Sequence, residues 1–325
     1  MNNLPESSSS NSLPLGGRAG DGASVLNSKL LLFGEYGLMY DAMALSVPFP
    51  RFSGFLDFDP DYSHLESTAG IRKFYEYLKS GDSFQKLHFS FNLESLGNDL
   101  SRGLFFNSNI PQQYGVGSSG ALVAALFSRY AATSVPKEKL TPELLKADFS
   151  LLESYFHGRS SGLDPLISYL NRPILINAEK QIVPLDFDLG NSDLAIALID
   201  TQTTGATGPL VQHFIEQFTF PEFELAFERQ FIPANNGCIE SLLKGNHQYF
   251  FLYLEQLIHF QLQHFRRMIP GNFQVFISDA VVEKVFIKLL GSGGGGFLIA
   301  FAETEMILDR WSEKDGIELL KVLNF

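Results

Sequence analysis

The feature that most constrains this chain is a glycine-rich stretch, residues 115–120, that runs directly into six apolar residues, 121–126. A helix that is apolar on all sides must be buried, so the sequence predicts a buried helix entered through glycines. Glycines let a backbone approach a ligand closely, and the N–H groups and dipole of a helix N-terminus attract anions. The segment therefore indicates either an ordinary helix start or a phosphate-binding loop.

A second glycine run, residues 291–296, precedes an apolar stretch that reads as a strand, residues 297–301. Both glycine segments contain the spacing G-x-G-x-x-G. The first lacks an acidic residue about twenty positions later, and the second leads into a strand where a dinucleotide site needs a helix. The Walker signature G-x-x-x-x-G-K-[ST] is absent as well. Any bound nucleotide must therefore be held by a loop of neither of these two types.

Length and charge narrow the class of protein. The chain has 325 residues, which favours two domains or one large one, and 24 basic against 36 acidic residues give a net charge of −12. No apolar run reaches the roughly 20 residues that a membrane-spanning helix needs, and the first thirty residues show no secretion signal. We therefore expect a cytoplasmic protein that binds neither membranes nor nucleic acid. A single cysteine, Cys238, agrees with a reducing compartment.

The order of the elements indicates an α+β fold. Residues 1–28 lack apolar periodicity and are expected to form a disordered tail, with order beginning at Lys29. Apolar spacing predicts helices over residues 65–79, 142–156 and about 247–268, and strands are mixed among them without a regular βαβ alternation. A strand at residues 194–200 opens the second half, so we expect two domains, residues 29–188 and 189–325.

Two carboxylates lie eleven positions apart on either side of a Ser-Gly loop, Glu153 and Asp164. Phosphoryl transfer needs such a pair, because one carboxylate binds Mg²⁺ and the other orients the acceptor hydroxyl. The alternative is structural: Asp164 followed by Pro165 is a good helix N-cap, and Glu153 is then a solvated helix residue. Lys29 at the head of an apolar strand is either an exposed end or an inward-pointing partner that keeps a carboxylate ionised.

Taken in order, these segments resemble the motifs of the GHMP kinase superfamily, and within it those of the mevalonate kinases. The matching segments are residues 29–39, 111–121, 157–164 and 288–296, with a weaker fifth match at residues 201–211. This chain departs from the family at single positions: Tyr36 stands for histidine, Val116 for leucine, Gly120 for alanine, Ser160 for proline and Gly205 for arginine.

The resemblance implies a fold of two α+β domains with the active site in the cleft between them. Residues 29–188 would form an ATP-binding domain like the second domain of ribosomal protein S5, and residues 189–325 the C-terminal domain. ATP and Mg²⁺ would be the cofactors. The implied phosphate-binding residues are Gly115, Gly117, Ser118, Ser119 and Gly120, and the implied metal ligands are Ser119 and Glu153.

The resemblance also implies the catalytic and acceptor residues. Asp164 would accept or orient the proton of the acceptor hydroxyl, with Lys29 beside it. The residues implied at the acceptor are Glu35, Tyr36, His157, Gly158, Ser161, Thr207, Gly293 and Gly294. The function that follows is the ATP-dependent phosphorylation of the mevalonate hydroxyl.

Three alternatives remain open at this stage. Phosphomevalonate kinases often carry Ser-Ser-Gly in the second motif, and this chain does too, with Gly120 at the third position. Another GHMP small-molecule kinase is the second alternative, although the spacing of residues 157–164 with Glu153 matches the sugar kinases poorly. A catalytically silent sensor is disfavoured because Lys29, Ser119, Glu153 and Asp164 are all present. A second phosphate on the acceptor calls for a cluster of basic residues, and this chain offers only Arg159 and Arg172 nearby.

The aromatic helix near residues 247–268 is suited equally to a core and to a homodimer interface.

Overall fold

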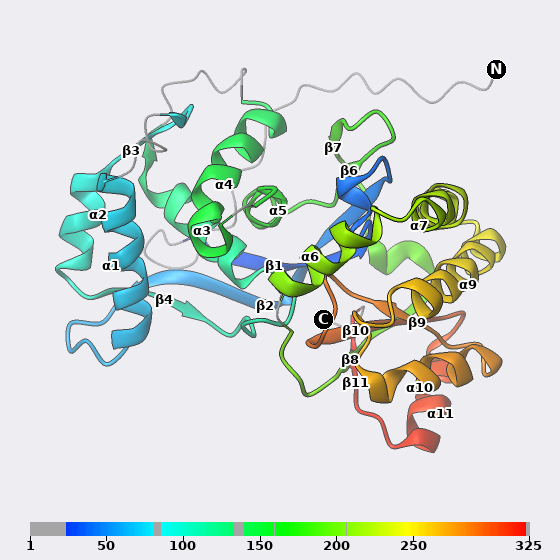
Figure 1. Ribbon diagram of the computed structural model, residues 1–325. Coiled ribbons are helices and arrows are strands. Elements are labelled where there is room, and N and C mark those ends of the chain that lie inside the picture. Colours follow the sequence, from blue (N-terminus) through cyan, green and yellow to red (C-terminus); the bar gives the residue numbers. More distant parts are fainter. Residues whose placement is uncertain (1–23, 81–85, 133–139, 159, 206, 323–325) are drawn as a thin grey trace.

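The computed structural model describes residues 24–80, 86–132, 140–158, 160–205 and 207–322. Its strands form two larger antiparallel sheets and one short two-stranded pair, and helices cover both larger sheets (Figure 1). The α+β class expected from the sequence is confirmed, because the helices and the antiparallel strands do not alternate as βαβ units.

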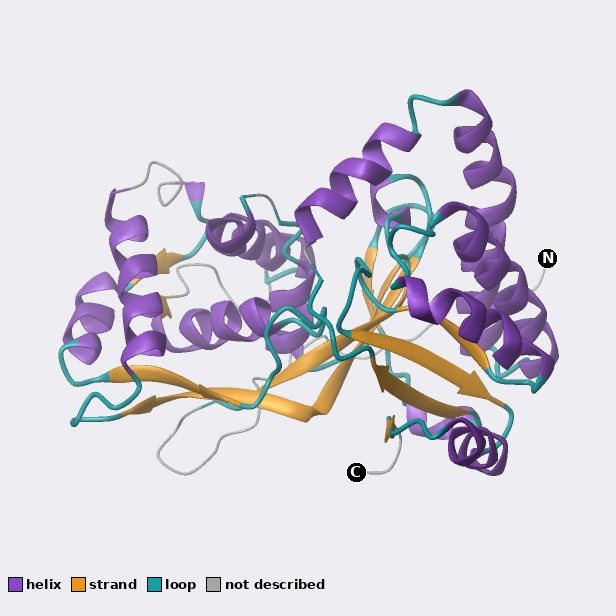
Figure 2. Cartoon of the chain, turned by 60° about the horizontal axis from the view of Figure 1, so that its bottom comes forward, coloured by secondary structure: helices purple, strands orange, loops and turns teal. Residues whose placement is uncertain are grey.

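The first sheet has the order β1-β2-β6-β7, with β4 paired to the far half of β2. Figure 2 shows these strands as a long ribbon that reaches from the helices at one end of the molecule to the second sheet. The strands are β1 (Leu26–Phe33), β2 (Ala44–Phe58), β4 (Leu104–Ser108), β6 (Ile174–Ile176) and β7 (Ile182–Pro184), and the separate pair is β3 (Ser90–Phe91) with β5 (Ala131–Ala132).

The start of β1 corrects the expected tail. Residues 1–23 lie outside the described part of the chain. Strand β1 begins at Leu26, which pairs with Gly54 of the antiparallel strand β2. Leu26 is buried, and the Ser28 hydroxyl donates to the Phe49 carbonyl oxygen at 2.8 Å. The strand starts three residues before Lys29 because β2 is long enough to supply backbone partners there.

Helices of the N-terminal half fall into two groups. Helices α3 and α5 contact β1 and β2, and α4 packs on α3 and α5. Helices α1 and α2 cover the region around β4 (Figure 1). The bounds are α1 (Leu65–Ser80), α2 (Leu93–Leu100), α3 (Ser118–Tyr130), α4 (Pro142–His157) and α5 (Leu163–Leu170). The buried helix expected after the first glycine segment is therefore α3, whose residues 123–127 are all buried.

The second sheet has the order β11-β8-β10-β9, with α9, α10 and α11 packed around it. Its strands are β8 (Ala195–Asp200), β9 (Phe286–Leu289), β10 (Phe297–Ala302) and β11 (Leu319–Lys321). The helices are α6 (Thr207–Gln217), α7 (Pro221–Ala226), α8 (Ile232–Leu243), α9 (His247–His264), α10 (Gly271–Val282) and α11 (Glu305–Asp315), with a π-helical turn at Phe227–Phe231 before α8. The division of the chain at residue 188 stays a prediction.

Buried aromatic side chains join the two halves. Phe33 at the end of β1 lies with its ring centroid 6.0 Å from those of Phe250 on α9 and Phe301 on β10. All three side chains are completely buried. The end of β1, where the first motif lies, is thus packed against the second sheet.

Candidate active site

Lys29 and Asp164 form an ion pair at the edge of the first sheet. The Lys29 ammonium lies 3.0 Å from Asp164 Oδ1, and the lysine side chain is only 6% exposed while the aspartate is 32% exposed. Lys29 lies in β1, and its backbone N–H donates to the Val116 carbonyl oxygen in the glycine segment. The lysine therefore points inward at a carboxylate, and the carboxylate remains accessible.

Asp164 lies in the first turn of α5, but it is not the N-cap. The cap position is Gly162, at a φ of 72°, and no side chain caps this helix. The structural alternative for Asp164 is therefore wrong, since its carboxylate is turned toward Lys29 instead of the helix N–H groups.

The glycine segment before α3 lies directly beside this pair. Gly117 is the N-cap of α3 at a φ of 82°, and no side chain caps the helix. A Cβ at Gly117 would lie 3.0 Å from Lys29 Cγ and 3.6 Å from Asp164 Oδ2. Both the left-handed backbone and the lack of room require glycine. The N-terminus of α3, where an anion is favoured, thus adjoins the Lys29–Asp164 pair.

Gly120 has a packing role that the sequence did not indicate. A Cβ at this position would lie 2.8 Å from the Asp164 Cβ and 2.9 Å from the Pro165 nitrogen. Glycine here lets α3 approach the start of α5 closely, which explains why the alanine of the family motif is absent. Phosphate contacts of Gly115, Gly117, Ser118, Ser119 and Gly120 stay predictions.

Glu153 on α4 is buried and held at both carboxylate oxygens. Ser119 donates its hydroxyl to Oε1 at 3.1 Å, and the Ser160 hydroxyl donates to Oε2. Burial, together with the nearby charge of Asp164, raises the pKa of Glu153 to about 7, against the opposing effects of Ser160, Ser119 and Lys29. The solvated-helix alternative for Glu153 is wrong, because the residue is only 4% exposed.

These residues suit Mg²⁺ bound together with ATP. Mg²⁺ prefers oxygen ligands and is usually held by one or two carboxylates plus substrate phosphates and water. Glu153 and Ser119 supply a carboxylate and a hydroxyl within hydrogen-bonding distance of each other. A bound cation would offset both the burial of Glu153 and its repulsion by Asp164. Among the described residues, no group of three or more His, Cys, Asp or Glu side chains forms an all-protein metal site.

The second glycine run lies against the first glycine segment. A Cβ at Gly115 would lie 3.5 Å from the Leu290 carbonyl oxygen, and one at Gly296 would lie 2.7 Å from that of Tyr114. Gly294 donates its N–H to the Met268 carbonyl oxygen at 2.6 Å, and a Cβ at Gly293 would lie 2.3 Å from the same oxygen. The two glycine segments thus adjoin one another, while acceptor contacts of Gly293 and Gly294 stay predictions.

Gly205 replaces the arginine of the family for a steric reason. A Cβ at this position would lie 2.6 Å from the Gly293 carbonyl oxygen and 3.2 Å from the Gly295 nitrogen. The chain therefore packs backbone on backbone where the family carries a long basic side chain. Arg172, one of the two basic residues expected near the acceptor, is ion-paired with Asp186, and Arg159 lies outside the described residues.

Glu35, expected at the acceptor, lies in a buried ion pair. Its carboxylate is ion-paired with the Lys288 ammonium on β9, and both side chains are completely buried. Lys288 also donates to the carbonyl oxygens of Leu32 and Leu289, at 2.9 and 2.5 Å. Burial raises the pKa of Glu35, although Lys288 opposes this. A carboxylate sealed in this way is part of the scaffold that joins β1 to β9.

Tyr36 occupies the histidine position of the family and binds the second glycine run. Its hydroxyl donates to the Ser292 carbonyl oxygen at 2.5 Å, and its ring packs on Phe214 and Phe265. Burial raises the pKa of the Tyr36 hydroxyl, with the charge of Glu35 adding to it, which keeps the group a neutral donor. Contact of Tyr36 with the acceptor stays a prediction.

The remaining expected acceptor residues lie at helix ends. Gly158 is the C-cap of α4, and Ser161 accepts a hydrogen bond from the Leu163 N–H at 3.3 Å before α5. His157 ends α4 and Thr207 begins α6, but their side chains lie outside the described part of the structure. Their contacts with an acceptor therefore stay predictions.

Two residues at this site had no role assigned from the sequence. The Ser160 hydroxyl binds Glu153, and the only signal for it was its departure from the family proline. Lys288 stood inside a recognised motif, but a lysine in an apolar strand does not reveal which carboxylate it meets.

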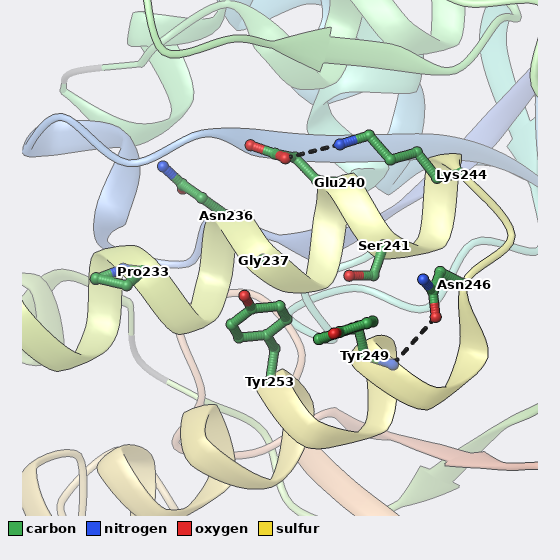
Figure 3. Close-up of a pocket in the computed structure, with 9 residues that line it drawn as sticks. All are labelled: Pro233, Asn236, Gly237, Glu240, Ser241, Lys244, Asn246, Tyr249 and Tyr253. Atoms are coloured by element: carbon green, nitrogen blue, oxygen red, sulfur yellow. Dashed lines mark hydrogen bonds and ion pairs between the residues drawn. The ribbon is translucent and has the colours of Figure 1, made fainter.

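A separate cavity of about 380 Å³ lies between α8 and α9 (Figure 3). Some of its polar side chains already have partners: Glu240 pairs with Lys244, and Asn246 accepts from the Tyr249 N–H. Asn236 accepts from the Met43 N–H. We therefore place the candidate active site at Asp164 and not in this cavity. In the described part of the chain, no helix has the length and apolar character needed to cross a membrane.

Comparison with known proteins agrees with this geometry. Residues 75–172 match the family model described as the GHMP kinases N terminal domain. A comparison with curated protein sequences gave no match. The L. major mevalonate kinase in complex with R-mevalonate is 20% identical, with a TM-score of 0.61 over 93% of this chain and 95% of that one.

Two further solved structures have the same fold. The Methanococcus jannaschii mevalonate kinase is 17% identical, with a TM-score of 0.59 over 95% of this chain and 98% of that one. The Streptococcus pneumoniae phosphomevalonate kinase in complex with phosphomevalonate and AMPPNP is 15% identical, with a TM-score of 0.58 over 92% and 98%. At these identities the structures establish the fold and leave the acceptor open. Residues 75–172 thus carry a GHMP kinases N-terminal domain, and the two-sheet α+β fold of the chain is the fold of these kinases.

Proposed function

We propose that this protein transfers the γ-phosphoryl group of ATP to the hydroxyl of mevalonate. The observation that carries the proposal is the Lys29–Asp164 pair at the N-terminus of α3. It brings an accessible carboxylate, a cation and a phosphate-binding helix start to one place, with Glu153 and Ser119 alongside. Phosphoryl transfer depends mainly on such positioning and charge neutralisation.

Each group has one task in this reaction. The acceptor oxygen bonds to the γ-phosphorus as the bond to the ADP oxygen breaks, and Asp164 takes the acceptor proton. Lys29 orients the Asp164 carboxylate through their 3.0 Å contact. The N–H groups at the start of α3 hold phosphate oxygens. Glu153 and Ser119 would hold Mg²⁺ together with the phosphates, and the ion would supply positive charge against the charge on the transferred group.

The acceptor is the finer part of the proposal, and it rests on charge. Mevalonate carries one carboxylate, whereas phosphomevalonate adds a phosphate of roughly −1.5 to −2 that arginines normally bind. Here Gly205 is packed against the glycine run, and Arg172 is paired with Asp186. These facts support an acceptor without a second phosphate.

An ATP-consumption screen of the purified protein against mevalonate, phosphomevalonate and hexoses tests the proposal. We expect kcat/KM for mevalonate to exceed that for phosphomevalonate at least about tenfold, or about 1.4 kcal/mol of transition-state stabilisation. The reverse ranking would make the protein a phosphomevalonate kinase. ATP binding without turnover of any acceptor would favour a sensor.

A further inference from the structure

Ser160 stands where the related segment of mevalonate kinases has proline, and its hydroxyl is directed at Glu153. The Ser160 hydroxyl donates to Glu153 Oε2 while Ser119 donates to Oε1. A carboxylate bound at both oxygens cannot rotate about its terminal bond without losing a hydrogen bond. A proline at position 160 would leave Oε2 without this donor.

The position of Ser160 is itself fixed by three hydrogen bonds. Its backbone N–H donates to Ser154 Oγ at 3.1 Å, and its carbonyl oxygen accepts from the Ser150 hydroxyl at 2.6 Å. The Gly162 N–H donates to Ser160 Oγ at 3.0 Å. Because Oγ already accepts from Gly162, its own proton is left for Glu153. The loop between α4 and α5 is therefore built to present one donor to one carboxylate oxygen.

We propose that Ser160 is a positioning residue that holds the Glu153 carboxylate in the orientation in which it binds the divalent cation. The inference rests on the proposed function, which assigns Glu153 to Mg²⁺. Side chains that bind and orient metal ligands typically contribute 10- to 100-fold to metal affinity or activity. Ser160 would act through Glu153 and touch neither the phosphates nor the acceptor.

The decisive variant is Ser160→Ala, measured by the binding of Mn²⁺ in the presence of ATP with electron paramagnetic resonance. Mn²⁺ takes the same oxygen ligands as Mg²⁺ and is directly observable. We expect Ser160→Ala to weaken Mn²⁺ binding about tenfold and to raise the Mg²⁺ concentration for half-maximal activity by a similar factor. The KM for the acceptor should stay within about twofold, because the acceptor is not touched.

Two further variants separate this role from a general loss of structure. Ser160→Thr keeps the hydroxyl and should bind Mn²⁺ within about threefold of the wild type. Ser168→Ala is a matched control, since Ser168 is a buried serine of α5 whose hydroxyl has no hydrogen-bond partner in the part of the chain that the structure describes. We expect it to leave Mn²⁺ binding unchanged.

Glu153→Gln, measured alongside, distinguishes this inference from the proposed function. If Glu153→Gln weakens Mn²⁺ binding and Ser160→Ala does not, Glu153 binds the metal and the role of Ser160 is overturned. Equal losses in Ser160→Ala and Ser160→Thr would overturn it too, because the hydroxyl would not be the cause. If neither Glu153→Gln nor Ser160→Ala weakens binding, the metal assignment itself is wrong.

Discussion

Two lysine–carboxylate pairs of this protein invite comparison, because the first motif contributes to both. It supplies Lys29 to one pair and Glu35 to the other, six positions further along the chain. In the Lys29–Asp164 pair the carboxylate is 32% exposed and borders Gly117 at the N-terminus of α3. In the Lys288–Glu35 pair both side chains are completely buried.

The difference shows how similar chemistry serves two purposes. An accessible carboxylate beside a helix N-terminus can meet a hydroxyl and release its proton to solvent. A completely buried pair cannot contact a substrate. The Lys288 ammonium already donates to Glu35 and to two backbone carbonyl oxygens. The accessible Lys29–Asp164 pair, here called the open pair, is therefore suited to the reaction. The buried Lys288–Glu35 pair, here called the sealed pair, fixes the end of β1 to β9.

The largest expected effect is on the open pair, in Asp164→Asn. The amide keeps the volume but does not accept a proton at neutral pH, so kcat should fall by about 10² to 10⁴ while ATP binding stays within a few-fold. Because the buried Lys29 ammonium keeps only an amide partner, some loss of stability is expected, and circular dichroism at the assay temperature should show that the variant stays folded. Asp193→Asn, at an exposed helix end, is the matched control and should keep full activity. Full activity in Asp164→Asn would remove this carboxylate from the mechanism.

The next largest effect is on the sealed pair, in Lys288→Met. The substitution leaves the Glu35 carboxylate buried without its cation, and breaking a buried pair in this way typically costs about 3–5 kcal/mol. Urea unfolding should show a loss in this range. Lys244→Met, which breaks an exposed pair with Glu240, should cost less than about 1 kcal/mol.

Adding Glu35→Gln to Lys288→Met tests the pairing itself. The double variant has no unpaired buried charge, so it should recover at least half of the lost stability. If the two substitutions instead add their separate costs, the ion pair is not what joins β1 to β9. The comparison with the open pair would then lose its basis.

The sequence predicted more of the open site than of the scaffold behind it. Glycine segments, a lysine and two carboxylates follow local rules of spacing, and the structure brings Lys29, Gly117, Ser119, Glu153 and Asp164 together. The Lys288–Glu35 pair joins residues 253 positions apart, and no local pattern specifies such a contact. Glu35 was therefore expected at the acceptor, whereas its partner, Lys288, lies in the second sheet.

Strand limits failed for a related reason. Order was expected from Lys29, but β1 begins at Leu26 because β2 supplies its partners. Pro48 likewise does not end its strand, since β2 continues to Phe58 and its far half pairs with β4. Proline ends a strand only where its missing N–H would be needed, and that depends on partners distant in sequence. Conversely, helices α1 and α4 follow local periodicity and capping, and both appeared within one residue of the expected ends.

The smallest expected effect lies at the boundary between the two regions, in Tyr36→Phe. Removing the hydroxyl loses one hydrogen bond, to the Ser292 carbonyl oxygen, and leaves the ring packed on Phe214 and Phe265. Such a loss typically costs about 0.5–1.5 kcal/mol of stability. If Tyr36 belongs to the scaffold alone, urea unfolding should show this cost while the KM for the acceptor stays within about twofold. An acceptor KM raised tenfold or more, with little change in stability, would instead place the Tyr36 hydroxyl among the groups that bind the acceptor, and the open site would then extend one residue beyond the sealed Glu35.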